Sequence, residues 1–256
     1  MKKGKFVFMA CFVWLSLMFS ANSSHAVSIS NSKAIIYWDT LDISGIEIEW
    51  ISISKGSGCG ADAQDDWDYD DSWDRKDGWV DTSAFASVTN AKADAWTTDT
   101  ELYEEVLARS TGPYGAGSSA AAWRWGGFIA LETGDLTISV DYYLTQDLST
   151  EYLGEWAEGE AAAGLHLYNE ATGDSAEDWG HLYYNYVYDG GSDYSEDYGT
   201  LTVTLWFDEG QEGEFHANVW NHADVYSPVP VPCTMLLLGS GLAGLGLIGR
   251  RFRKMV

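Results

Sequence analysis

The segment from Ala63 to Asp81 holds the residues whose types and spacing suggest chemistry most clearly. Tryptophans recur in it every six residues, at Trp67, Trp73 and Trp79. In an extended chain this even spacing places all three indoles on one face. Flat aromatic faces suit the apolar side of a sugar ring, and neighbouring aspartates can accept hydrogen bonds from its hydroxyls. Two interpretations stay open: a carbohydrate-binding surface, or tryptophans that pack on the fold while the aspartates face water, which the usual burial of tryptophan favours.

The same segment offers carboxylates at Asp66, Asp68 and Asp70, the alternate positions at which calcium loops supply oxygen ligands. The rest of that loop pattern is absent, because Asp71 stands where glycine is required and Asp77 where glutamate is required. Two interpretations therefore stay open, a calcium site and a solvated acidic loop. No other cofactor is indicated.

Catalytic motifs are scarce. The histidines of the central region show no H-x-x-x-H or H-E-x-x-H spacing, and His166 and His216 fall at outward positions of expected strands. No Gly-x-Ser-x-Gly elbow or phosphate-binding loop is present. A carboxylate pair for glycoside hydrolysis cannot be selected from 39 acidic residues, because the required separation is spatial. We therefore expect a non-catalytic protein.

The elements that would position these residues are predicted to be β-strands. Apolar residues alternate along residues 136–144, 201–207, 215–219 and 163–167, and the phase of an earlier strand slips at Trp50-Ile51, which predicts a bulge. Gly- and Asp-rich turns separate these stretches. Only Thr100 to Arg109 is expected to be helical. Residues 27–227 are thus predicted to form an all-β domain, an antiparallel β-sandwich of jelly-roll-like topology.

Cysteine usage excludes an internal disulfide framework. Cys11 and Cys233 lie in the terminal segments, which leaves Cys59 alone in the domain. Its neighbours in Ser57-Gly58-Cys59-Gly60 predict a loop. The thiol is either incidental or available for an intermolecular disulfide.

Charge excludes nucleic acid as a partner. Between the two terminal segments the chain carries 7 basic and 39 acidic residues, a formal charge of −32. Such a surface repels phosphate backbones. It attracts divalent cations or keeps the protein soluble by self-repulsion.

The first 26 residues have the organisation of a secretory signal peptide. Lys2, Lys3 and Lys5 precede an apolar stretch, and Ser24-His25-Ala26 supplies the small-x-small pattern for signal peptidase. Cleavage is expected between Ala26 and Val27.

The last residues, 228–256, combine a proline segment, an apolar stretch and a basic cluster. Residues 233–249 carry no charge and are expected to form a transmembrane helix, with the basic end in the cytoplasm. The notable residues are Val229, Pro230, Val231, Pro232, Thr234, Arg250 and Arg251.

This arrangement resembles the PEP-CTERM sorting signal, in which a Val-Pro-Glu-Pro-like motif precedes Thr, Leu-Leu-Gly-x-Gly-Leu and an arginine cluster. Val231 stands where the family usually has glutamate. The resemblance implies processing by exosortase, a membrane-embedded cysteine protease-transpeptidase. It also implies a Gram-negative-type bacterium whose envelope carries exopolysaccharide, and it covers only the tail.

We therefore expect an exported envelope or extracellular-matrix protein that associates with exopolysaccharide, anchored in the membrane as a precursor. The first alternative is a carbohydrate-binding module, assisted by calcium, that uses Trp67, Trp73 and Trp79. The second is a secreted glycan-active enzyme.

Overall fold

The chain folds as two layers of β-sheet. The computed structural model describes residues 27–111 and 115–228, which contain twelve strands and no helix. They belong to one compact unit, Ala26–Pro228. All strand pairs are antiparallel, and each of the two sheets has six strands, so the expected all-β sandwich architecture is observed.

The first sheet has the strand order β11-β8-β1-β6-β5-β4. Its strands are β11 (Ser192–Phe207), β8 (Gly134–Thr150), β1 (Ser28–Ser44), β6 (Glu101–Ser110), β5 (Ala91–Thr97) and β4 (Thr82–Ser87). The second sheet has the order β10-β9-β12-β7-β2-β3. Its strands are β10 (Ser175–Tyr188), β9 (Trp156–Asn169), β12 (Glu212–Tyr226), β7 (Gly115–Ala130), β2 (Ile48–Asp65) and β3 (Tyr69–Asp77).

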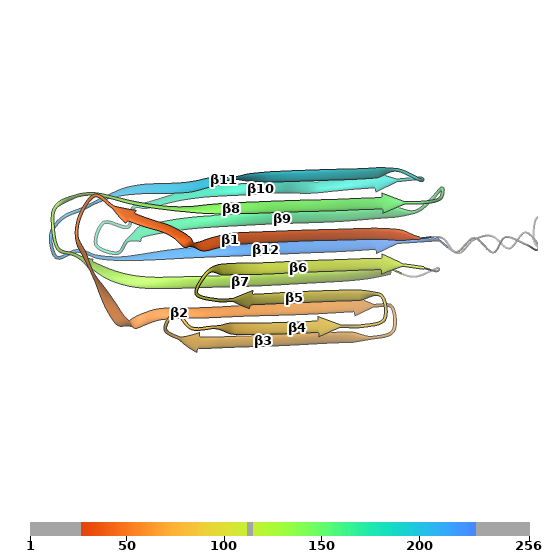
Figure 1. Ribbon diagram of the computed structural model, residues 1–256, viewed down its shortest axis with the longest axis horizontal. Helices are drawn as coiled ribbons and strands as arrows, with labels where there is room; N and C mark the ends of the chain where they lie inside the picture. Colours follow the sequence, from red (N-terminus) through yellow and green to blue (C-terminus); the bar gives the residue numbers. More distant parts are fainter. Residues whose placement is uncertain (1–26, 112–114, 229–256) are drawn as a thin grey trace, which may run out of the picture. The chain divides into compact units, whose positions relative to one another are not determined.

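Strands of the two sheets overlie one another and run in nearly the same direction (Figure 1). β11 lies against β10, β8 against β9 and β1 against β12. Three antiparallel pairs are nested in chain order. The pair β9–β10 lies within β8–β11, which in turn lies within β7–β12. The chain between β7 and β12 is therefore one long hairpin folded across both layers.

The alternating patterns mark the strands whose inner side chains build the core. Leu136, Ile138 and Leu144 of β8 are fully buried between the sheets, and so are Phe215 and Val219 of β12 in the second sheet. The predicted irregularity near Trp50 is also confirmed, because the register of β2 and β7 shifts between Trp50 and Lys55.

The helix predicted over Thr100–Arg109 is wrong. The segment forms β6, with Leu102, Glu104, Val106 and Ala108 pointing inward and pairing to β1 and β5 on either side. Its residues are good helix formers, but the alternating inner set can be buried only by a strand at this place. Tertiary packing overrides local propensity here.

The size of the side chains in the interior changes along the strands. Trp38, Trp50, Trp79, Phe128 and Phe215 form an aromatic cluster in which Trp79 lies 4.9 Å from Trp50 between ring centroids. The rest of the second sheet's inner face is largely alanine, on β7 and β9. Small side chains leave room for polar residues between the layers.

Polar side chains are buried between the alanine-rich parts of the sheets. Asn221 Nδ2 donates to the backbone oxygens of Ser32 and Glu104, at 3.2 and 3.3 Å, and so joins β12 to both β1 and β6. Glu104 has no exposed surface, and its Oε1 accepts the backbone N–H of Ala122 at 3.3 Å. Burial raises the pKa of Glu104 well above its usual range.

Cys59 lies in the middle of strand β2 and not in a loop. Its side chain is fully buried against the first sheet, and burial raises the pKa of its thiol. The glycines on either side of it face outward and occupy strand positions, which explains why the local sequence resembles a loop.

We expect the Cys59 thiol of the native protein to be inert. A thiol reagent should leave it unmodified under native conditions and titrate it fully in denaturant, and non-reducing gels should show no Cys59-linked dimer. Rapid native modification would contradict the placement of Cys59 in the core. The variant Ser57→Cys is not a suitable control, since Ser57 is buried as well; Ser83→Cys, on an exposed position of β4, should react at once.

The terminal segments contribute nothing to this description. The predicted signal peptide and, from Val229 onward, the predicted sorting motif, its helix and Arg250 and Arg251 lie outside the described residues. Across the ranges that are described, no helix suited to crossing a membrane occurs.

Candidate functional site

Tryptophans on the outer face of the second sheet rest on glycines of neighbouring strands. Gly60 of β2 is paired with Trp73 of β3, and a Cβ at Gly60 would lie 2.8 Å from that indole. Gly58 is paired with Trp123 of β7, whose ring would be 2.6 Å from a Cβ there. The absent side chains let the rings lie on the sheet and present an aromatic face outward.

A hollow of about 340 Å³ lies beside Trp73 on this face. Its floor contains Gly60 and Ala121, and the indoles of Trp73 and Trp220 stand at its sides. Volumes of a few hundred Å³ are typical of small-ligand sites. The lining residues are Gly60, Asp62, Trp73, Ser119, Ala120, Ala121, Tyr184, Trp220, Asn221 and His222.

A row of polar side chains crosses the same hollow, next to the row that contains Trp73 and Trp220. The register aligns Glu160 of β9, His222 of β12, Ser119 of β7 and Asp62 of β2 side by side on the outer face. Adjacent strands are roughly 4.8 Å apart, so this row extends the width of the hollow. An aromatic row and a row of hydrogen-bonding groups therefore lie next to each other.

The polar row is held in place by contacts within the protein. Ser119 Oγ donates to the Asp62 carboxylate. His181 Nε2 lies 2.6 Å from Glu160 Oε1. His222 Nε2 lies 2.9 Å from a carboxylate oxygen of Asp224, two residues further along β12, and this hydrogen bond raises the pKa of His222.

Tyr184 closes the hollow on the β10 side. Its interaction with Glu160, followed by burial, raises the pKa of its phenol to about 12, so the hydroxyl is a hydrogen-bond donor at neutral pH. The preorganised donors and acceptors around the hollow match the chemistry of sugar hydroxyls.

A second hollow, of about 280 Å³, continues along β7 on the same face. Its floor contains Gly115 and Gly117, and Trp156 and Tyr226 line it as a stacked pair with ring centroids 6.4 Å apart. Asp224 borders it next to His222 of the first hollow. We call the two hollows together the aromatic groove; it follows β7, whose outward residues there are small.

Only one of the three predicted tryptophans lines the groove. Trp73 is 69% exposed beside it, whereas Trp67 is exposed in the turn between β2 and β3. Trp79 is turned toward the aromatic cluster, and its Nε1 donates to the backbone oxygen of Trp125 at 2.8 Å. The expected single face fails because β3 ends at Asp77 and Gly78, at φ +81°, reverses the chain.

Two of the three predicted calcium residues, Asp68 and Asp70, accept hydrogen bonds from backbone N–H groups of the protein. Asp68 Oδ1 accepts the N–H of Tyr69, and Asp70 Oδ2 accepts the N–H of Ser87 on β4 at 2.8 Å. Asp66 lies in the turn and borders the second hollow. Over the described residues no group of three or more His, Cys, Asp or Glu side chains is arranged to hold a metal ion.

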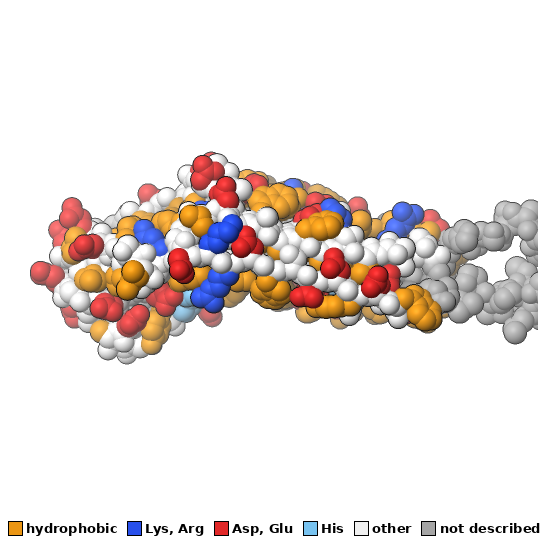
Figure 2. Space-filling view, turned by 90° about the horizontal axis from the view of Figure 1, so that it is seen from below, with side chains coloured by type: hydrophobic (Ala, Val, Ile, Leu, Met, Phe, Trp, Pro, Cys, Tyr) orange, Lys and Arg blue, Asp and Glu red, His pale blue; other side chains and the backbone are white. Residues whose placement is uncertain are grey.

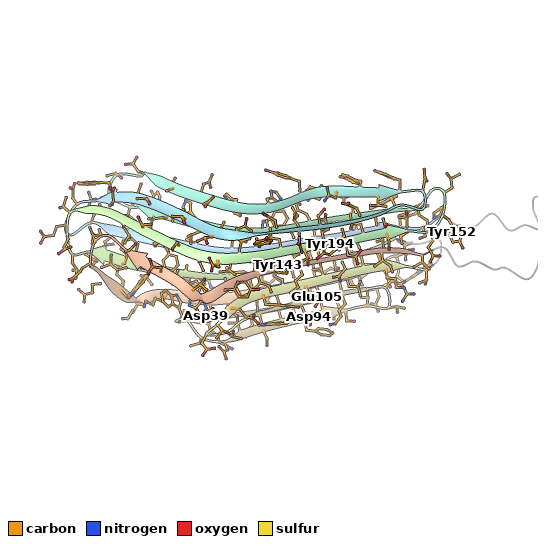
Figure 3. All side chains as sticks on the ribbon, turned by 45° about the horizontal axis from the view of Figure 1, so that its top comes forward. Asp39, Asp94, Glu105, Tyr143, Tyr152 and Tyr194 are labelled. Atoms are coloured by element: carbon orange, nitrogen blue, oxygen red, sulfur yellow. The ribbon has the colours of Figure 1, made fainter. Side chains whose placement is uncertain are left out.

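The outer face of the first sheet differs in how its aromatic residues are used. Trp96 stacks on Tyr103 at 3.7 Å, and the Tyr103 hydroxyl donates to Glu105 at 2.9 Å. Figure 3 labels Tyr143 on β8 and Tyr194 on β11, which lie four residues apart in the register, and Glu105 and Asp94 on β6 and β5. Tyr198 and Trp206 are exposed on this face. We prefer the second sheet as the binding face because both hollows described above lie on it.

The edge formed by β3 and β4 carries more acidic than basic side chains. Figure 2 shows Asp and Glu side chains distributed over this edge, with hydrophobic side chains and fewer Lys and Arg between them. The excess of negative charge found in the sequence therefore extends to the margin of the face that carries Trp73.

Sequence reasoning identified Trp73 but missed its partners. Trp220 and His222 alternate with the buried Val219 and Ala223 on β12, so their outward direction follows from the strand pattern. Their position opposite Trp73 does not, because it depends on β7 and β2 lying between them.

Comparisons with known proteins give no family. No protein-family model matches the chain, and no curated protein matches it. Vicilin from Corylus avellana (hazelnut) is 5% identical, with 76% of this chain and 72% of that chain covered and a TM-score of 0.13. The protein YhaK from Escherichia coli is 6% identical, covering 73% and 82%, with a TM-score of 0.11. These values are too low to support an argument about fold or function.

Proposed function

We propose that this protein is an exported, non-catalytic matrix or envelope protein that binds polysaccharide in the aromatic groove of its second sheet. The observation that carries the proposal is that Trp73 and Trp220 stand on opposite sides of a hollow whose floor contains Gly60 and Ala121. Trp73, whose ring lies on Gly60, supplies a flat apolar platform for a sugar ring, and Trp220 offers a second aromatic ring across the hollow. The adjacent row of Asp62, Ser119 and His222 supplies hydrogen-bond partners for hydroxyls.

The extended form of the groove favours a chain ligand over a single sugar. Two hollows follow one another along β7, each with aromatic residues at its side. A ligand with repeated rings could occupy both, and the linked contacts would add to its affinity. The wrapped hairpin from β7 to β12, which supports a jelly-roll-like description, supplies β7, β9, β10 and β12 of this face.

The sorting signals supply the setting for such a ligand. The signal peptide and the PEP-CTERM-like tail suggest export, processing by signal peptidase and exosortase, and delivery from a membrane-anchored precursor to the outer surface or matrix. An exported protein with a polysaccharide-binding face would hold the matrix to the envelope. Calcium assistance remains a hypothesis, and nucleic acid is not proposed as a partner.

The test is binding of the full chain to a panel of polysaccharides and short oligosaccharides, with calcium and with chelator. The binding buffer should contain a detergent without a sugar head group, which keeps the predicted transmembrane tail in solution. We expect saturable binding of at least one glycan with micromolar affinity, about 8 kcal/mol, and no release of reducing ends. Silence across the panel in both conditions would contradict glycan binding, and release of reducing ends would contradict the non-catalytic part.

A further inference from the structure

The aromatic groove is lined by anionic groups and by no strong cation. Asp62 and Asp224 come from the two strands that flank β7, and Asp66 borders the second hollow. Among the described residues that line either hollow there is no lysine and no arginine. Arg75, the nearest basic residue in the register, is placed over the Trp125 ring at 4.8 Å.

The histidines at the groove are each paired with a carboxylate. His222 is bound to Asp224 and His181 to Glu160, so neither adds an unbalanced positive charge. A uronate or sulfate group entering the groove would meet Asp62 and Asp66, and the described lining holds no lysine or arginine to balance them. Desolvating like charges together is unfavourable, and acidic polysaccharides are therefore disfavoured.

One carboxylate on this face is buried and already engaged. Glu160 is 3% exposed, and it projects from the outer face in the row that contains His222, Ser119 and Asp62. Its Oε1 is engaged by His181, and the Tyr184 hydroxyl interacts with the same carboxylate. Glu160 is not among the residues that line the two hollows, so the acceptors that a ligand meets there are Asp62 and Asp66.

We propose that the groove selects polysaccharides that carry free amino groups, such as polymers of unacetylated amino sugars. This inference rests on the proposed glycan-binding function and names the class of glycan. A protonated amine only donates hydrogen bonds, so it suits the carboxylates of Asp62 and Asp66, which accept them. The same cation is attracted to the faces of Trp73 and Trp220.

The experiment compares β-linked oligomers of glucosamine, N-acetylglucosamine, glucose and galacturonate as probes, using the full chain in sugar-free detergent at about pH 6, where an amine is protonated. We expect the glucosamine oligomer to bind about tenfold or more tightly than its acetylated form. Added salt should narrow this difference, because screening weakens charge pairs near the surface.

Variants assign the preference to the groove. Asp62→Asn and Asp66→Asn should each reduce the ratio of glucosamine to N-acetylglucosamine affinity severalfold, and the matched change Asp141→Asn, on the outer face of β8, should not change it. Unaltered melting temperatures show that the variants fold. If Asp62→Asn, which alters the acceptor of Ser119 Oγ, fails to fold, Asp66→Asn alone decides the assignment.

The outcomes separate this inference from the proposed function. Equal or tighter binding of the acetylated or glucose oligomer would overturn the preference for amines and leave glycan binding intact. Binding of galacturonate, with calcium or without it, would likewise overturn the inference. Failure of every oligomer to bind would overturn both.

Discussion

Replacing Trp73 with alanine is expected to weaken glycan binding by about 10- to 100-fold. Stacking of a flat ring on an aromatic side chain is worth roughly 1–3 kcal/mol where it has been measured for nucleic-acid bases, and each 1.4 kcal/mol corresponds to about a tenfold change. Trp73 is 69% exposed over Gly60, so the substitution removes a binding platform and little of the core. Titration calorimetry with the best oligosaccharide measures the change.

Two matched tryptophan variants serve as controls. Trp206→Ala removes an indole that is 55% exposed on the outer face of the first sheet and should leave affinity unchanged. Trp79→Ala should lower the free energy of unfolding by about 3 kcal/mol, because that ring packs against Trp38, Trp50 and Phe215. Wild-type affinity in Trp73→Ala would exclude Trp73 from the site.

Replacing Glu104 with glutamine is expected to stabilise the protein at neutral pH. The carboxyl is fully buried, its Oε2 has no partner among the described residues, and burial raises its pKa well above the usual range. The folded state therefore retains a proton that the unfolded chain releases near pH 4. Because the folded state binds more protons, stability falls as pH rises, by about 1.4 kcal/mol per unit, until the folded-state pKa is reached.

Urea unfolding at a series of pH values tests this expectation. The glutamine side chain resembles the protonated acid and carries no titration, so the advantage of Glu104→Gln should be near zero at about pH 4 and grow as pH increases. Glu105→Gln changes the next residue, which faces outward from β6 (Figure 3), and should lack this trend. Parallel curves for wild type and Glu104→Gln would contradict a protonated Glu104.

The parts of the fold that the sequence predicts are those in which each strand carries its own signal. Leu136, Ile138 and Val140 of β8, or Phe215 and Ala217 of β12, alternate with polar residues, and all of them are buried as expected. This signal requires no knowledge of the neighbouring strand. It identifies two-layer antiparallel architecture without its strand order.

The parts that it misses depend on contacts between distant segments. The glycines at 56, 58 and 60 give this part of β2 a loop-like sequence. They make room for Trp125, Trp123 and Trp73, and this role is evident only once β2 is paired with β7 and β3. β6 resembles a helix for the same reason, since its neighbours β1 and β5 determine its conformation.

The candidate site likewise contains one residue that the local sequence predicts and others that depend on distant segments. Trp73 was selected from its own neighbourhood, whereas Trp220 and Tyr184 reach the groove from strands that follow it by more than a hundred residues. The prediction that Trp79 shares a face with Trp67 and Trp73 was wrong because it treated residues 67–79 as one extended segment, although Gly78 reverses the chain. Spacing along a strand is informative only as far as the strand continues.

The most direct test of a glycan site on the second sheet is to follow the indole N–H signals of the tryptophans by NMR while the best oligosaccharide is added. Signals can be assigned with single Trp→Phe variants. The account predicts saturable shifts for Trp73, Trp220 and Trp156, with none for Trp96 and Trp206 of the first sheet. Shifts confined to Trp96 and Trp206, or none at all with a glycan that binds, would contradict it.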